Sequence, residues 1–151
     1  MIYTPLTIKA MQIAYKAHSA QLDVSGLPYI FHPYHIAEQM NDELTVCIAL
    51  LHDVIEDTDI TLEELGKNFP AEIIDVLKLL THKKGEDYFE YIKRIKENPA
   101  AKAVKLADIA HNCDFSRVNA NNSVSQDKLE HWRNKYLAAL KILAVDNFRR
   151  K

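Results

Sequence analysis

With 151 residues, a mass of 17.3 kDa, and 19 Lys and Arg against 21 Asp and Glu, the chain has a formal net charge of −2 when its histidines are neutral. Its length predicts that residues 1–151 form a single domain. Its 48% hydrophobic and 26% charged residues exclude a disordered chain. The near balance of charge argues against a nucleic-acid or membrane-surface partner. The chain has only three glycines, which argues against a Gly-rich phosphate loop. Its seven histidines raise the question of a metal or acid–base site.

The hydrophobic spacing predicts helices along the whole chain, because no stretch alternates apolar and polar residues as a half-buried strand does. The first helix is expected to begin at Thr4 or Thr7, and Pro33 to open a short second helix that ends near Met40. The apolar run 44–55 then predicts a helix that is buried on most of its sides.

In the second half of the chain, Thr61 and Glu64 have the spacing of a capping box, which predicts another helix start. Further helices are expected at 71–80, from Tyr88 onward, from Asn98-Pro99 to about Asn112, and at about 126–147. The polar stretch 119–123 is predicted to be a mobile loop. The fold class predicted from these patterns is all-α.

The cysteines and the N-terminal residues bear on the compartment. Cys47 and Cys113 are too few for a disulfide framework, and Cys47 lies in an apolar run, where we expect a buried and inert thiol. The N-terminus lacks a basic region followed by an apolar stretch, so no signal peptide is expected. No apolar run approaches the roughly 20 residues of a membrane span. We therefore expect a cytoplasmic protein.

The segment Leu51 to Thr58 places four polar side chains at the end of an apolar helix. Burying charge is costly unless it is paired or bound to a metal. His52 and Glu56 are four residues apart, as are Asp53 and Asp57, so the two pairs share adjacent faces of one turn. His52 and Asp53 can supply a nitrogen and an oxygen to one cation, and Glu56 and Asp57 are placed for acid–base work. The alternative is a solvated helix end.

Two further segments favour a metal. His32 precedes a proline, so we expect it in an extended conformation just before a helix. Lys105, Asp108 and Asn112 follow one another at i, i+3 and i+7 and so line one stripe of an otherwise apolar helix. Two histidines and two aspartates form a mixed nitrogen and oxygen set that suits Mn²⁺, Fe²⁺ or Zn²⁺.

Four sequence blocks occur in a fixed order between residues 13 and 117. They are Ala17-His18-x-x-Gln21, Ser25-Gly26-x-Pro28-Tyr29-Ile30-x-His32-Pro33, Leu50-Leu51-His52-Asp53-x-x-Glu56-Asp57-Thr58 and Val104-Lys105-Leu106-Ala107-Asp108-x-x-His111-Asn112. In this order they resemble the HD superfamily, and most closely the hydrolase domain of RelA/SpoT homologues and the single-domain small alarmone hydrolases. The resemblance implies a compact bundle of about eight helices that uses Mn²⁺ to remove the 3′-pyrophosphate from (p)ppGpp, the nucleotide alarmone of the stringent response.

Residue by residue, the resemblance implies a metal site, a catalytic pair and a nucleotide site. The metal ligands would be His32, His52, Asp53 and Asp108. Glu56 and Asp57 would orient or activate the attacking water. The candidate substrate-binding residues are Asn112, Lys105 and Ser25. The expected partner is a small nucleotide, with no nucleic acid and no membrane. A homo-oligomer is compatible with the sequence, but nothing in the sequence indicates one.

The chain departs from the family pattern at two arginine positions. Asp23 stands in the first loop where the family usually has an arginine that holds the guanine base, and Ile109 occupies another usual arginine position. Lys83, Lys84 and Arg117 flank the site blocks as other sources of positive charge. Two alternatives therefore remain: an HD-domain hydrolase of another nucleotide or phosphate ester, and a non-catalytic nucleotide-sensing module. The pair of Glu56 and Asp57 argues against the second, since a mere binding protein would not require it.

The aromatic residues of the second half of the chain have two interpretations. They could stack on a nucleotide base or pack into the core. Their helical spacing favours the core for Tyr88, Phe89, Tyr91 and Trp132.

Overall fold

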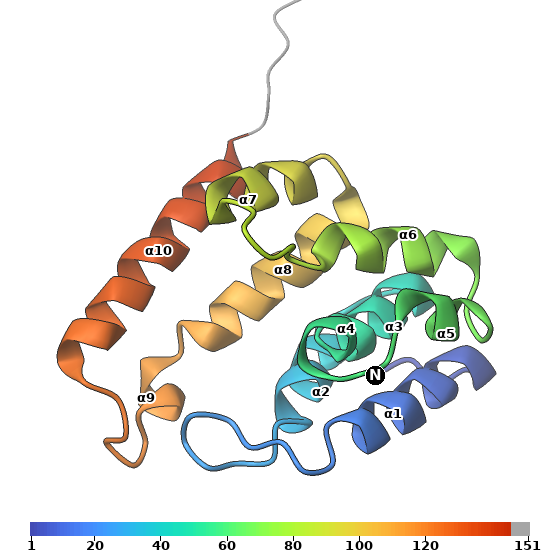
Figure 1. Cartoon of the computed structure of the whole chain (residues 1–151), viewed down its shortest axis with the longest axis horizontal. Coiled ribbons are helices and arrows are strands. Elements are labelled where there is room, and N and C mark those ends of the chain that lie inside the picture. Colours follow the sequence, from blue (N-terminus) through green and yellow to red (C-terminus); the bar gives the residue numbers. More distant parts are fainter. Residues whose placement is uncertain (146–151) are drawn as a thin grey trace, which may run out of the picture.

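The chain folds as a succession of helices, drawn in Figure 1 from the computed structural model, which describes residues 1–145. Within these residues the elements are α1 (Pro5–Ala17), α2 (Phe31–Glu38), α3 (Glu43–Leu51), α4 (Val54–Asp57), α5 (Leu62–Gly66), α6 (Ala71–Leu80), α7 (Tyr88–Lys96), α8 (Pro99–Asn112), α9 (Phe115–Val118) and α10 (Gln126–Ala144). The described part has no named strand, and its only β-type pairing is an isolated bridge between Leu22 and Pro28. The all-α prediction is confirmed.

Side-chain caps and prolines set most of the helix boundaries. Thr4 caps α1 ahead of Pro5, and Asn98 caps α8 ahead of Pro99. Thr61 and Glu64 form the predicted capping box at the start of α5. Each cap satisfies a backbone N–H that a helix start otherwise leaves unpaired. These boundaries agree with the sequence predictions because caps are local features.

Two of the predicted helices differ from the structure. Helix α2 begins at Phe31, two residues before Pro33, and ends at Glu38, so the expectation of an extended His32 is wrong: His32 lies in the first turn of the helix. The run 44–55 is divided, because α3 ends at Leu51 and α4 begins at Val54. Asp53, between them, has φ −97° and ψ −6°, at the edge of the right-handed helical region. Helix α10 is described to Ala144, and its predicted end at 147 lies outside the described residues.

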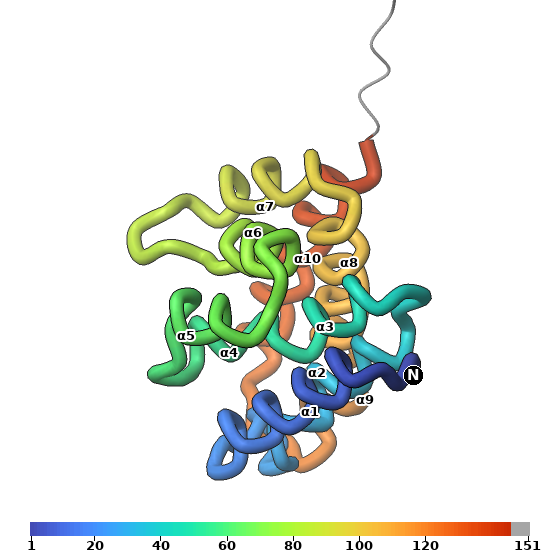
Figure 2. Tube along the Cα trace, turned by 90° about the vertical axis from the view of Figure 1, so that its right-hand side faces the viewer, coloured from blue at the N-terminus to red at the C-terminus, as the bar shows by residue number. Residues whose placement is uncertain are grey.

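Helix α3 lies at the centre of the fold. Every residue from Thr45 to Leu51 is buried. The helix packs against α1, α2, α6 and α8, and both views place it between α1 and α6 (Figures 1 and 2). A helix that is apolar on nearly all sides needs such a surround of partners.

The C-terminal helix closes the other side of the molecule. Helix α10 packs against α7 and α8, and Figure 1 shows it at the opposite edge from α1. The end of α3, the start of α2 and the middle of α8 therefore converge in the region that α10 borders. No helix in residues 1–145 combines the length and hydropathy that crossing a membrane would require.

Candidate active site

Four polar side chains meet at the end of α3. Nε2 of His32 lies 3.5 Å from Oδ2 of Asp53 and 3.1 Å from Oδ1 of Asp108. Nε2 of His52 lies 3.1 Å and 3.9 Å from the same two oxygens. The break between α3 and α4 makes this possible, because it brings His52 and Asp53 to α2 and α8. All four predicted metal ligands are thus adjacent, although they come from three separate segments.

The tautomer of His52 supports a cation in this cluster. Nδ1 of His52 lies 2.7 Å from the carbonyl oxygen of Ala49, one of the carbonyls that the end of α3 leaves free. Since a carbonyl can only accept, Nδ1 carries a hydrogen, so in the neutral ring Nε2 is the nitrogen that has the lone pair. That Nε2 is buried and has no hydrogen-bond partner among the described residues. A buried lone pair beside two carboxylates fits a metal ion, and His32, His52 and Asp53 form a group that could hold one.

The electrostatics of the cluster also call for positive charge. Burial lowers the pKa of His52, but the charges of Asp53 and Asp108 outweigh burial and raise that pKa well above 6.5. Conversely, burial raises the pKa of Asp108, while Lys105 and the histidines together bring it well below 3.8. The aspartates are therefore ionised, and either protons or a divalent cation must balance them.

Neighbouring side chains hold both carboxylates in place. The hydroxyl of Tyr29 donates to Oδ2 of Asp53 at 2.5 Å. Nζ of Lys105 donates to Oδ2 of Asp108 at 2.7 Å, and Nδ2 of Asn112 donates to Oδ1 of the same residue at 2.8 Å. Lys105 and Asn112 were predicted to bind substrate, and the structure places both of them on Asp108.

His32 is supported by a second histidine. Its Nδ1 lies 2.7 Å from Nδ1 of His111, whose ring also stacks on that of His35 at 4.4 Å. Burial, together with the charge of Arg117, lowers the pKa of His111 to about 4. A neutral His111 can accept a hydrogen from Nδ1 of His32, which leaves Nε2 of His32 free to face the carboxylates.

The predicted catalytic pair lies at the exposed rim of the cluster, on α4. Burial raises the pKa of Glu56, whose Oε1 accepts from the backbone N–H of His82. Oδ2 of Asp57 accepts from Nε2 of Gln21 at 3.0 Å, and Oε1 of Gln21 lies 2.7 Å from Nδ1 of His18. The buried His18 therefore fixes which way the amide of Gln21 points. Both acids keep oxygens available for a bound water.

Two adjacent recesses open from this cluster. The inner recess, of about 240 Å³, contains Asp53, Asp108, Glu56 and Lys105. The outer recess, of about 390 Å³, contains Asp23, Val24, Arg117 and Trp132. Both recesses are lined by a shared set of residues, which is Tyr29, His32, Asp57, Asn112 and Tyr136. A ligand could therefore occupy both at once.

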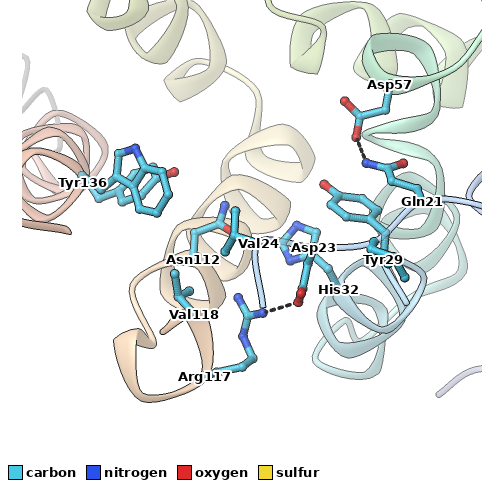
Figure 3. Close-up of a pocket in the computed structure, with 12 residues that line it drawn as sticks. Gln21, Asp23, Val24, Tyr29, His32, Asp57, Asn112, Arg117, Val118 and Tyr136 are labelled. Atoms are coloured by element: carbon cyan, nitrogen blue, oxygen red, sulfur yellow. Dashed lines mark hydrogen bonds and ion pairs between the residues drawn. The ribbon is translucent and has the colours of Figure 1, made fainter. Parts of the chain in front are cut away.

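Asp23 lines the outer recess, but it is paired. Figure 3 shows it facing Arg117, whose Nη1 donates to Oδ2 of Asp23 at 3.2 Å. The other oxygen of Asp23 accepts from the backbone N–H groups of Ser25 and Leu27. Ser25 itself donates its hydroxyl to the carbonyls of Arg117 and Val118 and is not one of the residues that line either recess. The structure thus gives Ser25 a role in holding the loop against α9.

The sequence predictions missed several of these residues. The expectation that the aromatic group is core holds for Tyr91, which is 3% exposed although it also lines the inner recess. Tyr88 and Trp132 line the recesses, and Phe89 is 36% exposed. Tyr29 belongs to the second block, which was the available signal for it. The side chains of α10 that line the recesses could not be recognised from the sequence, because core residues have the same helical spacing.

The comparisons with known proteins agree with this geometry. The family model of the HD domain matches residues 10–107. The chain belongs to the HD domain family. The match includes His32, His52 and Asp53 and ends one residue before Asp108, so the folded structure is what joins Asp108 to the HD cluster.

Relatives of this HD domain are larger proteins. A protein of Mycobacterium leprae named probable GTP pyrophosphokinase is 35% identical over 117 residues, which cover 69% of this chain and 15% of that protein. The guanosine-3′,5′-bis(diphosphate) 3′-pyrophosphohydrolase of Aquifex aeolicus is 31% identical over 112 residues, 66% of this chain and 16% of that protein. The chain therefore spans only about a sixth of these curated relatives.

A solved structure is similar over nearly the whole length. It is described as a metazoan ortholog of SpoT that hydrolyzes ppGpp and plays a role in starvation responses. The TM-score is 0.83 at 24% sequence identity, and the match covers 98% of this chain and 90% of that one. This likeness shows that the helical fold is shared.

Proposed function

We propose that this chain is a metal-dependent phosphohydrolase that removes the 3′-pyrophosphate from (p)ppGpp. The observation that carries the proposal is the meeting of two histidines and two aspartates around the buried lone pair of His52, beside Glu56 and Asp57. The names of the Aquifex relative and of the SpoT ortholog support this substrate.

In this proposal the cluster of His32, His52, Asp53 and Asp108 holds Mn²⁺, with Fe²⁺ or Zn²⁺ as other metals that suit nitrogen and oxygen ligands. A divalent cation supplies acidification of a bound water and offsets the negative charge that gathers on phosphorus. Tyr29, Lys105 and Asn112 keep the carboxylate oxygens turned toward the cluster through their hydrogen bonds.

Glu56 and Asp57 orient the attacking water and accept its proton. Both line the inner recess, and each has one oxygen fixed by a donor, the backbone of His82 for Glu56 and Gln21 for Asp57. A carboxylate whose direction is fixed transfers protons more efficiently than a mobile one, because no reorientation precedes the step.

The outer recess accommodates the nucleoside. Trp132, Val24 and Val118 give it apolar surface, and the pairing of Asp23 with Arg117 balances the acid that stands where the resemblance expects an arginine. A paired Asp23 does not repel a polyanionic substrate as a bare carboxylate would.

A second candidate function is hydrolysis of another nucleotide or phosphate ester. It is favoured by the two departures from the family pattern, since Asp23 is an acid in the recess and Ile109 is fully buried in the core. Neither residue can hold a base or a phosphate as an arginine does.

One experiment separates these functions. Purified protein loaded with Mn²⁺ is incubated with ppGpp, and we expect GDP and pyrophosphate as products, with no turnover in excess chelator. The absence of these products would contradict the proposal. Faster turnover of another member of a nucleotide and phosphate-ester panel favours the second candidate, and tight binding without any turnover favours a sensing module.

We further propose that the chain acts in the cytoplasm on a small nucleotide, without a nucleic-acid or membrane partner. The near-neutral charge of the chain supports this, since both of those surfaces attract strongly basic proteins.

A further inference from the structure

The cations of the two recesses differ in their partners. Nζ of Lys105 donates to Asp108, and Arg117 is paired with Asp23. Lys135, on α10, lines the inner recess with Lys105 but forms no ion pair with any carboxylate within residues 1–145. A lysine without a counter-ion beside a phosphate-sized recess is available for an anionic ligand.

Two aromatic rings hold this ammonium group in position. Nζ of Lys135 lies 4.1 Å from the centre of the Tyr88 ring and 5.8 Å from that of Tyr136, and both rings line the inner recess. Cation–π contacts of this kind favour the charged amine while leaving its hydrogens free to donate. Partial burial lowers the pKa of Lys135, and the charge of Lys105 lowers it further. The surroundings of Lys135 therefore do not fully balance its positive charge.

A donor beside Lys135 also lacks a partner. The hydroxyl of Tyr88 is buried and has no hydrogen-bond partner in the described part of the chain. Buried hydroxyls in folded proteins nearly always have a hydrogen-bond partner, so this hydroxyl and the unpaired cation beside it form a place where an acceptor can bind. A phosphate oxygen would satisfy both groups.

We propose that Lys135 binds the pyrophosphate group of the substrate, through oxygens of the phosphate that lies farther from the cluster of His32, His52, Asp53 and Asp108. This deepens the proposed function and rests on it for the identity of the whole substrate. Lys105 already neutralises Asp108, which leaves Lys135 as the cation for the second phosphate. A ligand with a single phosphate, bound at the cluster, would not need Lys135.

The test measures binding of inorganic pyrophosphate to the Mn²⁺-loaded protein by titration calorimetry. Losing a charge-assisted hydrogen bond costs about 10- to 100-fold in affinity, and we expect this loss for Lys135→Met. Orthophosphate affinity is expected to change by less than about threefold, and Lys135→Arg to restore most of the pyrophosphate affinity. The metal content of each variant should equal that of the wild type.

A matched control is available on the same helix. Lys128 also lies over an aromatic ring, 5.1 Å from the centre of Trp132, but it lines neither recess. Lys128→Met should leave pyrophosphate affinity unchanged. Equal weakening in both lysine variants, unchanged affinity in Lys135→Met, or no pyrophosphate binding by the wild type would each overturn the proposal. If Lys135→Met alters the folded state, judged by thermal unfolding, Lys135→Gln serves as the second neutral variant.

The outcomes for Lys135 and for the proposed function are separable. A wild type that does not hydrolyse ppGpp but loses pyrophosphate affinity in Lys135→Met contradicts the proposed function and supports the role of Lys135. A wild type that hydrolyses ppGpp, with Lys135→Met unchanged in pyrophosphate affinity and in KM, supports the function and refutes the role.

Discussion

Glu56 and Asp57 differ from the proposed metal ligands in lying at the exposed rim, so their removal should affect chemistry without removing the metal from the cluster. We predict that Glu56→Gln and Asp57→Asn each keep the wild-type metal content while ppGpp turnover falls about 10²- to 10⁴-fold, the usual contribution of a general base. Metal analysis and product release are measured on the same samples. Glu63→Gln, an exposed acid in the first turn of α5, is the control. Wild-type turnover in both variants would exclude them from the reaction.

The pair of Asp23 and Arg117 allows a double-mutant cycle in the outer recess. Both side chains are partly buried and joined at 3.2 Å, so we predict a coupling free energy of about 1 kcal/mol in nucleotide binding for Asp23→Ala and Arg117→Ala. Arg117→Ala should raise KM several-fold with kcat within about twofold, since uniform binding is lost. Additive effects of the two substitutions would show that the pair does not act together.

At the level of helices, local signals predicted much of the fold. Thr61 and Asn98 were recognised because a cap depends on a few adjacent residues. The break after Leu51 was not predicted, because 44–55 is apolar apart from Thr45, His52 and Asp53. Only the contacts of His52 and Asp53 with α2 and α8 explain it. The candidate site thus interrupts the regular helix where the sequence pattern predicts continuity.

The residues of the candidate site also differ in whether the sequence alone could reveal them. His52 and Asp53 stand out in the sequence as polar residues in an apolar run, whereas Lys135 on α10 occurs in a helix with many charged residues. Its position in the inner recess depends on how α10 packs against α7 and α8, which residue spacing does not encode. Likewise, the pairing of Asp23 with Arg117 joins residues 94 apart in the chain.

The central position of α3 predicts the reactivity of the two thiols. Cys47 is fully buried and burial raises its pKa to about 12. Burial also raises the pKa of Cys113, but this thiol is only partly buried and can be reached by a reagent. A thiol reagent at pH 8 should therefore label Cys113 in the native protein and Cys47 only after denaturation. Cys113→Ser should remove the native labelling completely. Labelling of Cys47 at the same rate as Cys113 would contradict the packing of α3.

At the scale of the whole molecule, the four-residue cluster links α2, α3 and α8, so a bound metal should stabilise the entire fold. Binding adds about 2.7 kcal/mol when the free metal is 100 times its Kd, which corresponds to roughly 5–10 °C in Tm for a chain of this size. We predict that chelation of the loaded protein lowers Tm by this amount in a thermal melt. His52→Ala, which removes the buried lone pair, should show almost no response to the chelator.

The metal-dependent change in Tm should also depend on pH. Without metal, Asp53 and Asp108 raise the pKa of His52, so the stability that its protonated ring contributes is present below pH 6.5 and is lost as pH rises through the raised value. A metal requires the neutral ring, so it competes with that proton. The increase in Tm on adding Mn²⁺ should therefore be larger at pH 8 than at pH 6. An equal increase at both values would mean that His52 does not bind the metal.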